Sequence, residues 1–293
     1  MSRPARFDYV APDNLNAVIE VLHGEPEATI LAGGQSLLPA MNLRLTRPSV
    51  LVDINGVEKL GGTSPTYHGL RLGALTRHRS IELSKVIQSR VPVLAEAAAM
   101  IGDPCVRRRG TLGGSLAYAD PGAELPVVAV LLQADIEVTG TLGARTVSAA
   151  EFFLGPHLTV LKPAEVLSAV SVPSPLPGEG CAIRKFAAQR HGAKLTAAAR
   201  VRLDNTGRCT GTRLVLGGVA ERPLVLDSGH RDLVGASQLS NSLLASIARK
   251  AGREATSAHR NDGSLSECCR LVEVVTAAAV AAAWVRSKPE TRQ

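Results

Sequence analysis

Two glycine pairs, each followed closely by a serine, are the features of this sequence best suited to holding an anion. The first pair lies in Ala32-Gly33-Gly34-Gln35-Ser36-Leu37, directly after the short apolar run of residues 29–31. Glycine reaches positive φ without steric cost and lets a ligand approach the backbone. We expect the amides of residues 33–37 to face one concavity beside the positive end of the next helix, as in a phosphate site. Turns of this kind also occur where nothing binds.

The second glycine pair repeats this arrangement about 80 residues later, in Gly110-Thr111-Leu112-Gly113-Gly114-Ser115, and again leads into a short helix. Two such clusters of amides fit a diphosphate that is flanked by two nucleoside-like halves. Neither motif matches the G-x-G-x-x-G fingerprint, and the sequence contains no G-x-x-x-x-G-K-[ST] phosphate loop. A Rossmann domain and a P-loop NTPase are therefore disfavoured.

The elements that position both motifs follow an α/β pattern. Asp13 is a good N-cap for a first helix that ends at Gly24, Ser36 can cap a second helix, and Thr76 can cap a third. His78, just after that third cap, is expected at the surface or behind the ligand-contacting residues. The predicted strands are residues 29–31, 50–54, 70–75, 135–139 and 166–172, and the longer predicted helices are residues 92–101 and 123–132.

A linker at residues 173–180 separates this region from a second one, because three prolines and two glycines in eight residues cannot continue a helix or a strand. Beyond it, three predicted strands are followed by two predicted helices. This order favours an α+β unit with helices on one face of an antiparallel sheet. The strands are residues 182–188, 195–203 and 212–216, and the helices are residues 239–254 and 266–286.

Charge and composition exclude several classes of protein. The net charge is +7, but the dense basic run at residues 107–109 has no interleaved aromatic side chains, so no nucleic-acid partner is expected. The five cysteines include no C-x-x-C pair, which argues against a metal site, and an odd number without a signal peptide favours a reducing cytoplasm. The most apolar tail, residues 271–285, contains Glu273 and is too short for a membrane span.

Both glycine motifs, with their flanking residues, resemble a known family. Residues 31–39 and residues 103–121 look like the two flavin motifs of the FAD-binding medium subunit of molybdenum hydroxylases, which include carbon monoxide dehydrogenase and xanthine dehydrogenase. The resemblance extends over essentially the whole chain. It implies FAD in a two-part domain of the vanillyl-alcohol oxidase type, residues 1–175 with subdomains of about 1–56 and 57–175. A smaller α+β domain would follow at residues 180–290. Nothing in the sequence marks a histidine for covalent attachment of the flavin, so we expect noncovalent binding.

The resemblance also implies which residues contact the cofactor. Both glycine motifs would hold the diphosphate, Glu124 would contact FAD, and Ile101, Leu167 and Lys185 would lie near the flavin ring. A cationic Lys185 could stabilise the reduced flavin, or it could be a solvated strand lysine. No catalytic residue is assigned. The expected cofactor-binding set is Ala32, Gly33, Gly34, Gln35, Ser36, Leu37, Ile101, Thr111, Gly113, Gly114, Ser115, Asp120, Glu124, Leu167 and Lys185.

In such complexes a large molybdopterin-binding subunit oxidises the substrate, and a small subunit with 2Fe-2S clusters passes electrons to FAD. The present sequence departs from the family pattern at Ala193 and Lys194, where an aspartate and then an aromatic residue are common, and Cys268 replaces a tyrosine. These changes concern the flavin face where electrons leave. For this reason a second function is an alternative, namely a stand-alone FAD-dependent oxidase or dehydrogenase that acts on a small metabolite. Such an enzyme could be a homodimer. A flavin-free scaffold is the third alternative.

Overall fold

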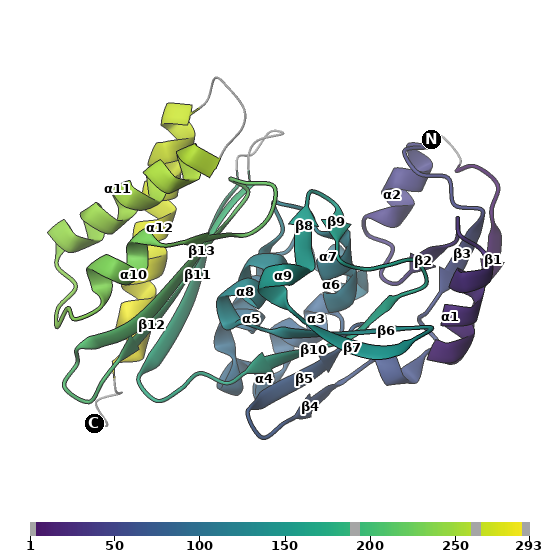
Figure 1. Cartoon of the computed structure of the whole chain (residues 1–293), viewed down its shortest axis with the longest axis horizontal. Helices are drawn as coiled ribbons and strands as arrows, with labels where there is room; N and C mark the ends of the chain where they lie inside the picture. Colours follow the sequence, from purple (N-terminus) through teal and green to yellow (C-terminus); the bar gives the residue numbers. More distant parts are fainter. Residues whose placement is uncertain (1–3, 188–193, 259–264, 289–293) are drawn as a thin grey trace.

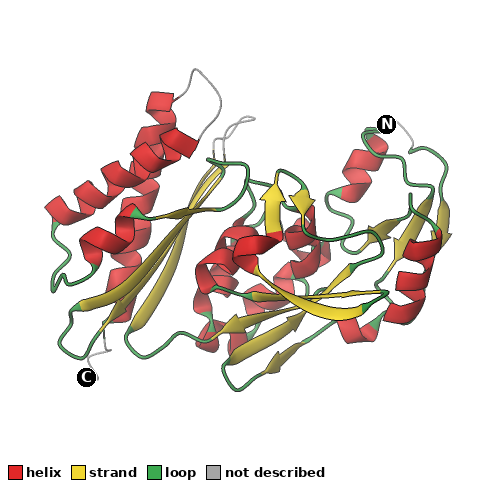
Figure 2. Ribbon diagram, in the orientation of Figure 1, coloured by secondary structure: helices red, strands yellow, loops and turns green. Residues whose placement is uncertain are grey.

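The computed structural model describes residues 4–187, 194–258 and 265–288, and within them three sheets of three or more strands follow one another along the chain (Figures 1 and 2). The first unit is a parallel sheet in the order β1-β3-β2, at the right of Figure 1. Its elements are β1 (Asp8–Val10), α1 (Leu15–Gly24), β2 (Thr29–Leu31), α2 (Leu37–Asn42) and β3 (Val50–Asp53). Val18 and Ile19 of α1 pack on Val52 in a small core of this unit.

Two helix starts in this unit differ from the predictions. Asn14, not Asp13, caps α1, because its side-chain oxygen accepts the amide hydrogen of Ala17 at 2.9 Å. Ser36 stands at the N-cap position of α2, but its side chain makes no capping hydrogen bond. The Ser36 hydroxyl therefore contributes nothing to starting this helix.

The second unit is an antiparallel sheet in the order β4-β5-β10-β6-β7, with helices packed against it (Figure 2). Thr76 does not cap a helix as expected, because its hydroxyl donates to the carbonyl of Gly62 at 2.8 Å. Every residue of α8 is buried, which explains its continuous apolar sequence. The elements are η1 (Glu58–Leu60), β4 (Thr63–Pro65), β5 (Gly69–Gly73), α3 (His78–Leu83), α4 (Lys85–Arg90), α5 (Pro92–Ala99), α6 (Pro104–Arg109), α7 (Leu112–Tyr118), α8 (Glu124–Leu132), β6 (Asp135–Gly140), β7 (Gly143–Ser148), α9 (Ala149–Phe152), β8 (Phe153–Gly155), β9 (Leu158–Thr159) and β10 (Val166–Pro173).

The third unit is the antiparallel sheet β11-β12-β13-β14, with two long helices along one face, as the sequence predicted (Figure 1). Alternate residues of a strand point to opposite faces. Cys181 and Ile183 of β11 join the core of the second unit, whereas Ala182 packs into the core beneath α12. Both faces of this sheet are thus covered. The elements are β11 (Glu179–Ala187), β12 (Lys194–Leu203), β13 (Cys209–Gly217), β14 (Leu224–Leu226), α10 (Ser228–Leu233), α11 (Asn241–Ala258) and α12 (Leu265–Ser287).

None of the helices in the described part of the chain combines the length and the apolar composition that crossing a membrane requires.

Candidate cofactor site

The two glycine motifs, about 80 residues apart in the sequence, meet in space. A methyl group added to Gly33 would lie 2.4 Å from the carbonyl oxygen of Arg109 and 2.8 Å from the Cα of Gly110. The residue at position 33 therefore has no room for a side chain, because the β2–α2 loop rests directly on the end of α6. Gly34 has a φ of 71°, which explains the second glycine of this loop.

A cavity of about 590 Å³ opens between these motifs. This volume lies within the range of small-molecule and cofactor pockets. Residues of both motifs line the cavity, together with apolar residues of α1 and β2 and the segment that precedes β10. Of the expected cofactor-binding residues, the cavity brings together Ala32, Gly33, Gly34, Gln35, Ser36, Leu37, Thr111, Gly113, Gly114, Ser115 and Leu167.

The first loop has the donor set that an anion requires. Within the described residues, the backbone amides of residues 33–37 have no hydrogen-bond acceptor in the protein. The Gln35 side chain turns back on the loop, because its amide nitrogen donates to the carbonyl oxygen of Gly33 at 3.1 Å. Consecutive free amides beside a helix start suit a phosphate.

The second motif differs from the expectation of a second loop of free amides. Its glycine pair, Gly113 and Gly114, belongs to the first turn of α7, and Thr111 caps that helix by accepting the amide hydrogen of Gly114 at 3.1 Å. The amides of Leu112 and Gly113 donate to backbone carbonyls that precede α3, at 2.9 and 2.8 Å. The amide of Ser115 donates to the Thr111 carbonyl at 3.0 Å. This motif therefore offers a ligand the Ser115 hydroxyl and close backbone approach, not a second nest of amides.

Two side chains that the sequence did not single out hold the motifs together. The Arg77 guanidinium donates to the carbonyl oxygen of Arg109 and, at 2.6 Å, to the side-chain oxygen of Asn55. Asn55 in turn donates to the carbonyl oxygen of Ala32 at 2.9 Å. One chain of hydrogen bonds thus connects the first loop to the end of α6. Asn55 stands two residues after β3, the strand beside β2, and this position is the sequence signal that could have identified it.

His78 lines the cavity beside the second motif, but it is almost fully buried, with only 3% of its surface exposed. Of the two places the sequence allowed, the surface is therefore wrong. Its Nε2 lies 2.9 Å from the carbonyl oxygen of Thr111 and 3.0 Å from the hydroxyl of Ser115. Burial lowers the pKa of His78 to about 4, against the smaller opposing effect of the hydrogen bond to Thr111. The imidazole is therefore neutral at physiological pH.

Lys185 and Glu124 form a second cluster, outside the lining of the cavity. The Lys185 ammonium donates to the Glu124 carboxylate and, at 3.1 Å, to the carbonyl oxygen of Met100. The two side chains are 18% and 7% exposed. Lys185 is therefore a paired, mostly buried residue, and the alternative of a solvated strand lysine is wrong. The pair joins β11 to the N-terminus of α8.

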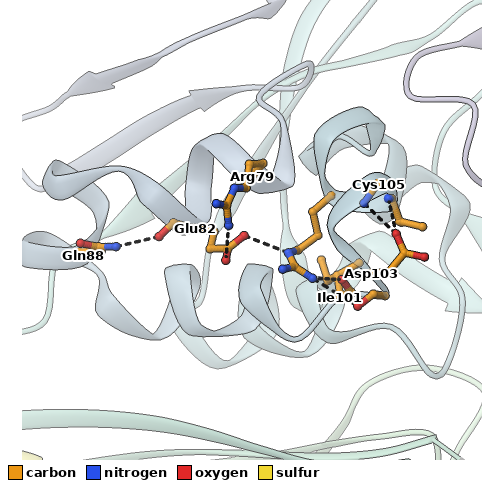
Figure 3. Close-up of polar contacts among 9 residues, drawn as sticks. Arg79, Glu82, Gln88, Ile101, Asp103 and Cys105 are labelled. Atoms are coloured by element: carbon orange, nitrogen blue, oxygen red, sulfur yellow. Dashed lines mark hydrogen bonds and ion pairs between the residues drawn. The ribbon is translucent and has the colours of Figure 1, made fainter.

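Ile101 follows Met100, the C-cap residue of α5 whose carbonyl accepts from Lys185, and Figure 3 shows its polar surroundings. Its carbonyl oxygen accepts a hydrogen bond from Arg107 at 3.1 Å, and Arg107 also pairs with Glu82 at 2.9 Å. Figure 3 shows Glu82 between Arg79 and the segment that carries Ile101, with Asp103 capping α6 through the amide of Cys105 at 2.7 Å. The backbone around Ile101 is thereby fixed in place.

Asp120 begins the turn that leads into α8, where its carboxylate accepts the amide hydrogen of Gly122 at 2.9 Å. This turn lies against the start of β12, since a methyl group on Gly122 would be 3.3 Å from the Cβ of Lys194. Lys194 is itself exposed. Ala193 and the side chain of Cys268, two of the positions that depart from the family pattern, lie outside the described residues.

Comparison with known proteins places this geometry in a family. Residues 5–175 match the family model described as the FAD binding domain in molybdopterin dehydrogenase. The chain is 42% identical over 220 residues to the 6-hydroxypseudooxynicotine dehydrogenase complex subunit alpha of Paenarthrobacter nicotinovorans, covering 74% of each chain. It is 37% identical over 235 residues to the carbon monoxide dehydrogenase medium chain of Hydrogenophaga pseudoflava, covering 79% of this chain and 81% of the relative.

The fold of this chain also matches that of solved structures from the same group of relatives. A structure of carbon monoxide dehydrogenase from Hydrogenophaga pseudoflava, which lacks the Mo-pyranopterin moiety of its molybdenum cofactor, matches with a TM-score of 0.90 at 32% identity. The match covers 97% of this chain and 99% of the solved one. The mixed helix and strand fold therefore extends over nearly the whole length of that relative.

Proposed function

The chain belongs to the family of FAD binding domains of molybdopterin dehydrogenases, and we propose that it is the electron-transfer subunit of a molybdenum hydroxylase-type complex. A molybdopterin-binding large subunit would oxidise the substrate, and a small 2Fe-2S subunit would bring the electrons to FAD. The meeting of two distant glycine motifs around one cavity, inside the matched residues 5–175, is the observation that carries the proposal.

The residues around the cavity fit noncovalent FAD. The free amides of residues 33–37 and the Ser115 hydroxyl are the proposed donors to the diphosphate, with the glycines keeping the backbone accessible. Leu167, Ile101 and Asp120 are proposed to line the path toward the flavin ring, where the pair Glu124–Lys185 would lie. This proposal includes the two-part domain of the vanillyl-alcohol oxidase type, residues 1–175, and a second domain at residues 180–290. The proposal also locates the chain in the cytoplasm.

When bound, a flavin accepts electrons one at a time and can release two as hydride. The residues of this chain position the cofactor and set the electrostatics around it. Lys185 brings a positive charge to the proposed ring end of the site, and Glu124 offsets much of that charge. The chain supplies no assigned catalytic side chain, since oxidation of the substrate would take place on the large subunit.

Affinity purification from the native cells tests this function. We expect FAD, molybdenum and iron to elute with the chain in fixed ratio, together with a large and a small subunit. The same cells carrying the variant Gly33→Ala serve as the control for FAD, because the added methyl group would separate the two motifs. A chain that elutes alone with FAD and oxidises a small metabolite would contradict the proposal and favour the stand-alone enzyme.

A further inference from the structure

His78 is a buried, titratable side chain next to the cavity for which the proposed function has no role so far. Its Nε2 faces two oxygens, the carbonyl of Thr111 and the hydroxyl of Ser115, at 2.9 and 3.0 Å. Its Nδ1 has no hydrogen-bond partner among the described residues. The ring also explains a glycine of the second motif, because a methyl group on Gly110 would lie 2.7 Å from Nδ1.

These contacts determine which nitrogen carries the proton. A carbonyl oxygen can only accept, so Nε2 must carry the hydrogen that is donated to Thr111. The opposite tautomer would place the Nε2 lone pair against the carbonyl and leave a buried Nδ1–H without an acceptor. The nearest cations, Arg77 before α3 and Arg107 on α6, further oppose protonation of Nδ1. His78 is therefore the neutral Nε2–H tautomer.

This tautomer fixes the direction of the Ser115 hydroxyl. A protonated Nε2 has no lone pair in the ring plane, so Ser115 cannot donate its hydrogen to the ring. It can only accept a share of the one hydrogen that Nε2 also donates to Thr111. No other acceptor for this hydroxyl is recorded in the described part of the chain. The hydroxyl hydrogen is thus left to point into the cavity that Ser115 lines.

We propose that His78 is a positioning residue that makes the Ser115 hydroxyl a dedicated donor to the diphosphate group of the bound nucleotide. The proposal rests on the proposed FAD site. It assigns to His78 a role that depends on its Nε2–H group and not on bulk or charge. A glutamine can supply the same N–H, because its amide nitrogen stands about as far from the backbone as Nε2 does, whereas leucine fills the space without a donor.

Binding of ADP and of adenosine to the FAD-free full chain tests this role without any redox activity. We expect His78→Leu and Ser115→Ala each to weaken ADP binding about tenfold, which is the effect of one hydrogen bond to a charged group. The double variant should bind ADP about as weakly as either single variant, because both changes remove the same donor. His78→Gln should restore ADP affinity to within about threefold of the wild type, and adenosine, which has no phosphate, should bind all four variants equally.

The pH dependence supplies a second readout. The terminal phosphate of ADP titrates in this range, so the wild type is compared with His78→Gln, which shares that effect. Since the pKa of His78 is about 4, the ratio of their ADP affinities should stay level from pH 5.5 to 8. Two results would overturn the positioning role. One is that the losses of ADP affinity in the two single variants multiply in the double variant, and the other is that His78→Leu weakens adenosine binding as much as ADP binding. Failure of the wild-type chain to bind FAD or ADP at all would instead contradict the proposed function, so the two failures are distinguishable.

Discussion

The contact between Gly33 and the end of α6 makes Gly33→Ala the sharpest test of how the cavity is built. The added Cβ would stand 2.4 Å from the Arg109 carbonyl oxygen, whereas ordinary van der Waals contact begins at 3.4 Å. The difference of about 1 Å must be met by displacing backbone on one side or the other, because neither atom belongs to a flexible side chain. Overpacking of this kind costs about 1–3 kcal/mol.

The displaced segment is the loop whose free amides are proposed to hold the diphosphate. We therefore expect the FAD dissociation constant of Gly33→Ala to rise about tenfold or more, measured by titrating the FAD-free chain and following flavin fluorescence. Gly24→Ala is the matched control. It lies in the same N-terminal unit, has no atom within 4 Å of an added Cβ, and should bind FAD within about twofold of the wild type. Equal FAD affinity of Gly33→Ala and the wild type would refute the packing argument.

Three further predictions concern other residues in and around the cavity. Arg77→Lys should weaken FAD binding about tenfold in the same titration, since an ammonium group cannot replace the fork that joins the two motifs; unchanged binding would show that this link is dispensable. Glu124→Gln should lower the free energy of unfolding in urea by about 3 kcal/mol, because it leaves the Lys185 ammonium buried without its carboxylate, and adding Lys185→Met should restore part of the loss. The folded-state pKa of His78 lies below its ordinary value, so the stability it contributes is present above pH 6.5 and is lost as the pH falls toward 4. The wild type should therefore lose about 3 kcal/mol more than His78→Gln between pH 7 and 4 in urea unfolding, and parallel losses would contradict the assignment.

The sequence predicted the elements whose signals are local. Apolar stretches after the proline- and glycine-rich segment located β11, β12 and β13, and the continuous apolar run located α8. The glycine pairs located both motifs, because a backbone that must approach another segment closely excludes side chains. The strands β1, β4, β7, β8, β9 and β14 were missed. All of them except β7 have three residues or fewer, which is too few positions to show alternation.

What the sequence could not supply is the set of hydrogen bonds between distant segments. The amides of the second motif were expected to be free, yet Gly113 donates to the carbonyl of Ala74, a residue far away in the chain. The resemblance assigned both Glu124 and Lys185 to the cofactor site, but it did not indicate their ion pair, which only the tertiary fold creates. Arg77 was missed for the same reason, because its two acceptors belong to segments that only the tertiary fold brings together.

The absorbance spectrum of the purified chain from 300 to 600 nm tests the central claim most directly. The account predicts flavin bands after purification or after incubation with FAD, and FAD as the nucleotide released by heat. The Gly33→Ala variant should hold less flavin than Gly24→Ala at equal FAD concentration. A chain that folds, remains colourless in excess FAD and releases no flavin would contradict the account.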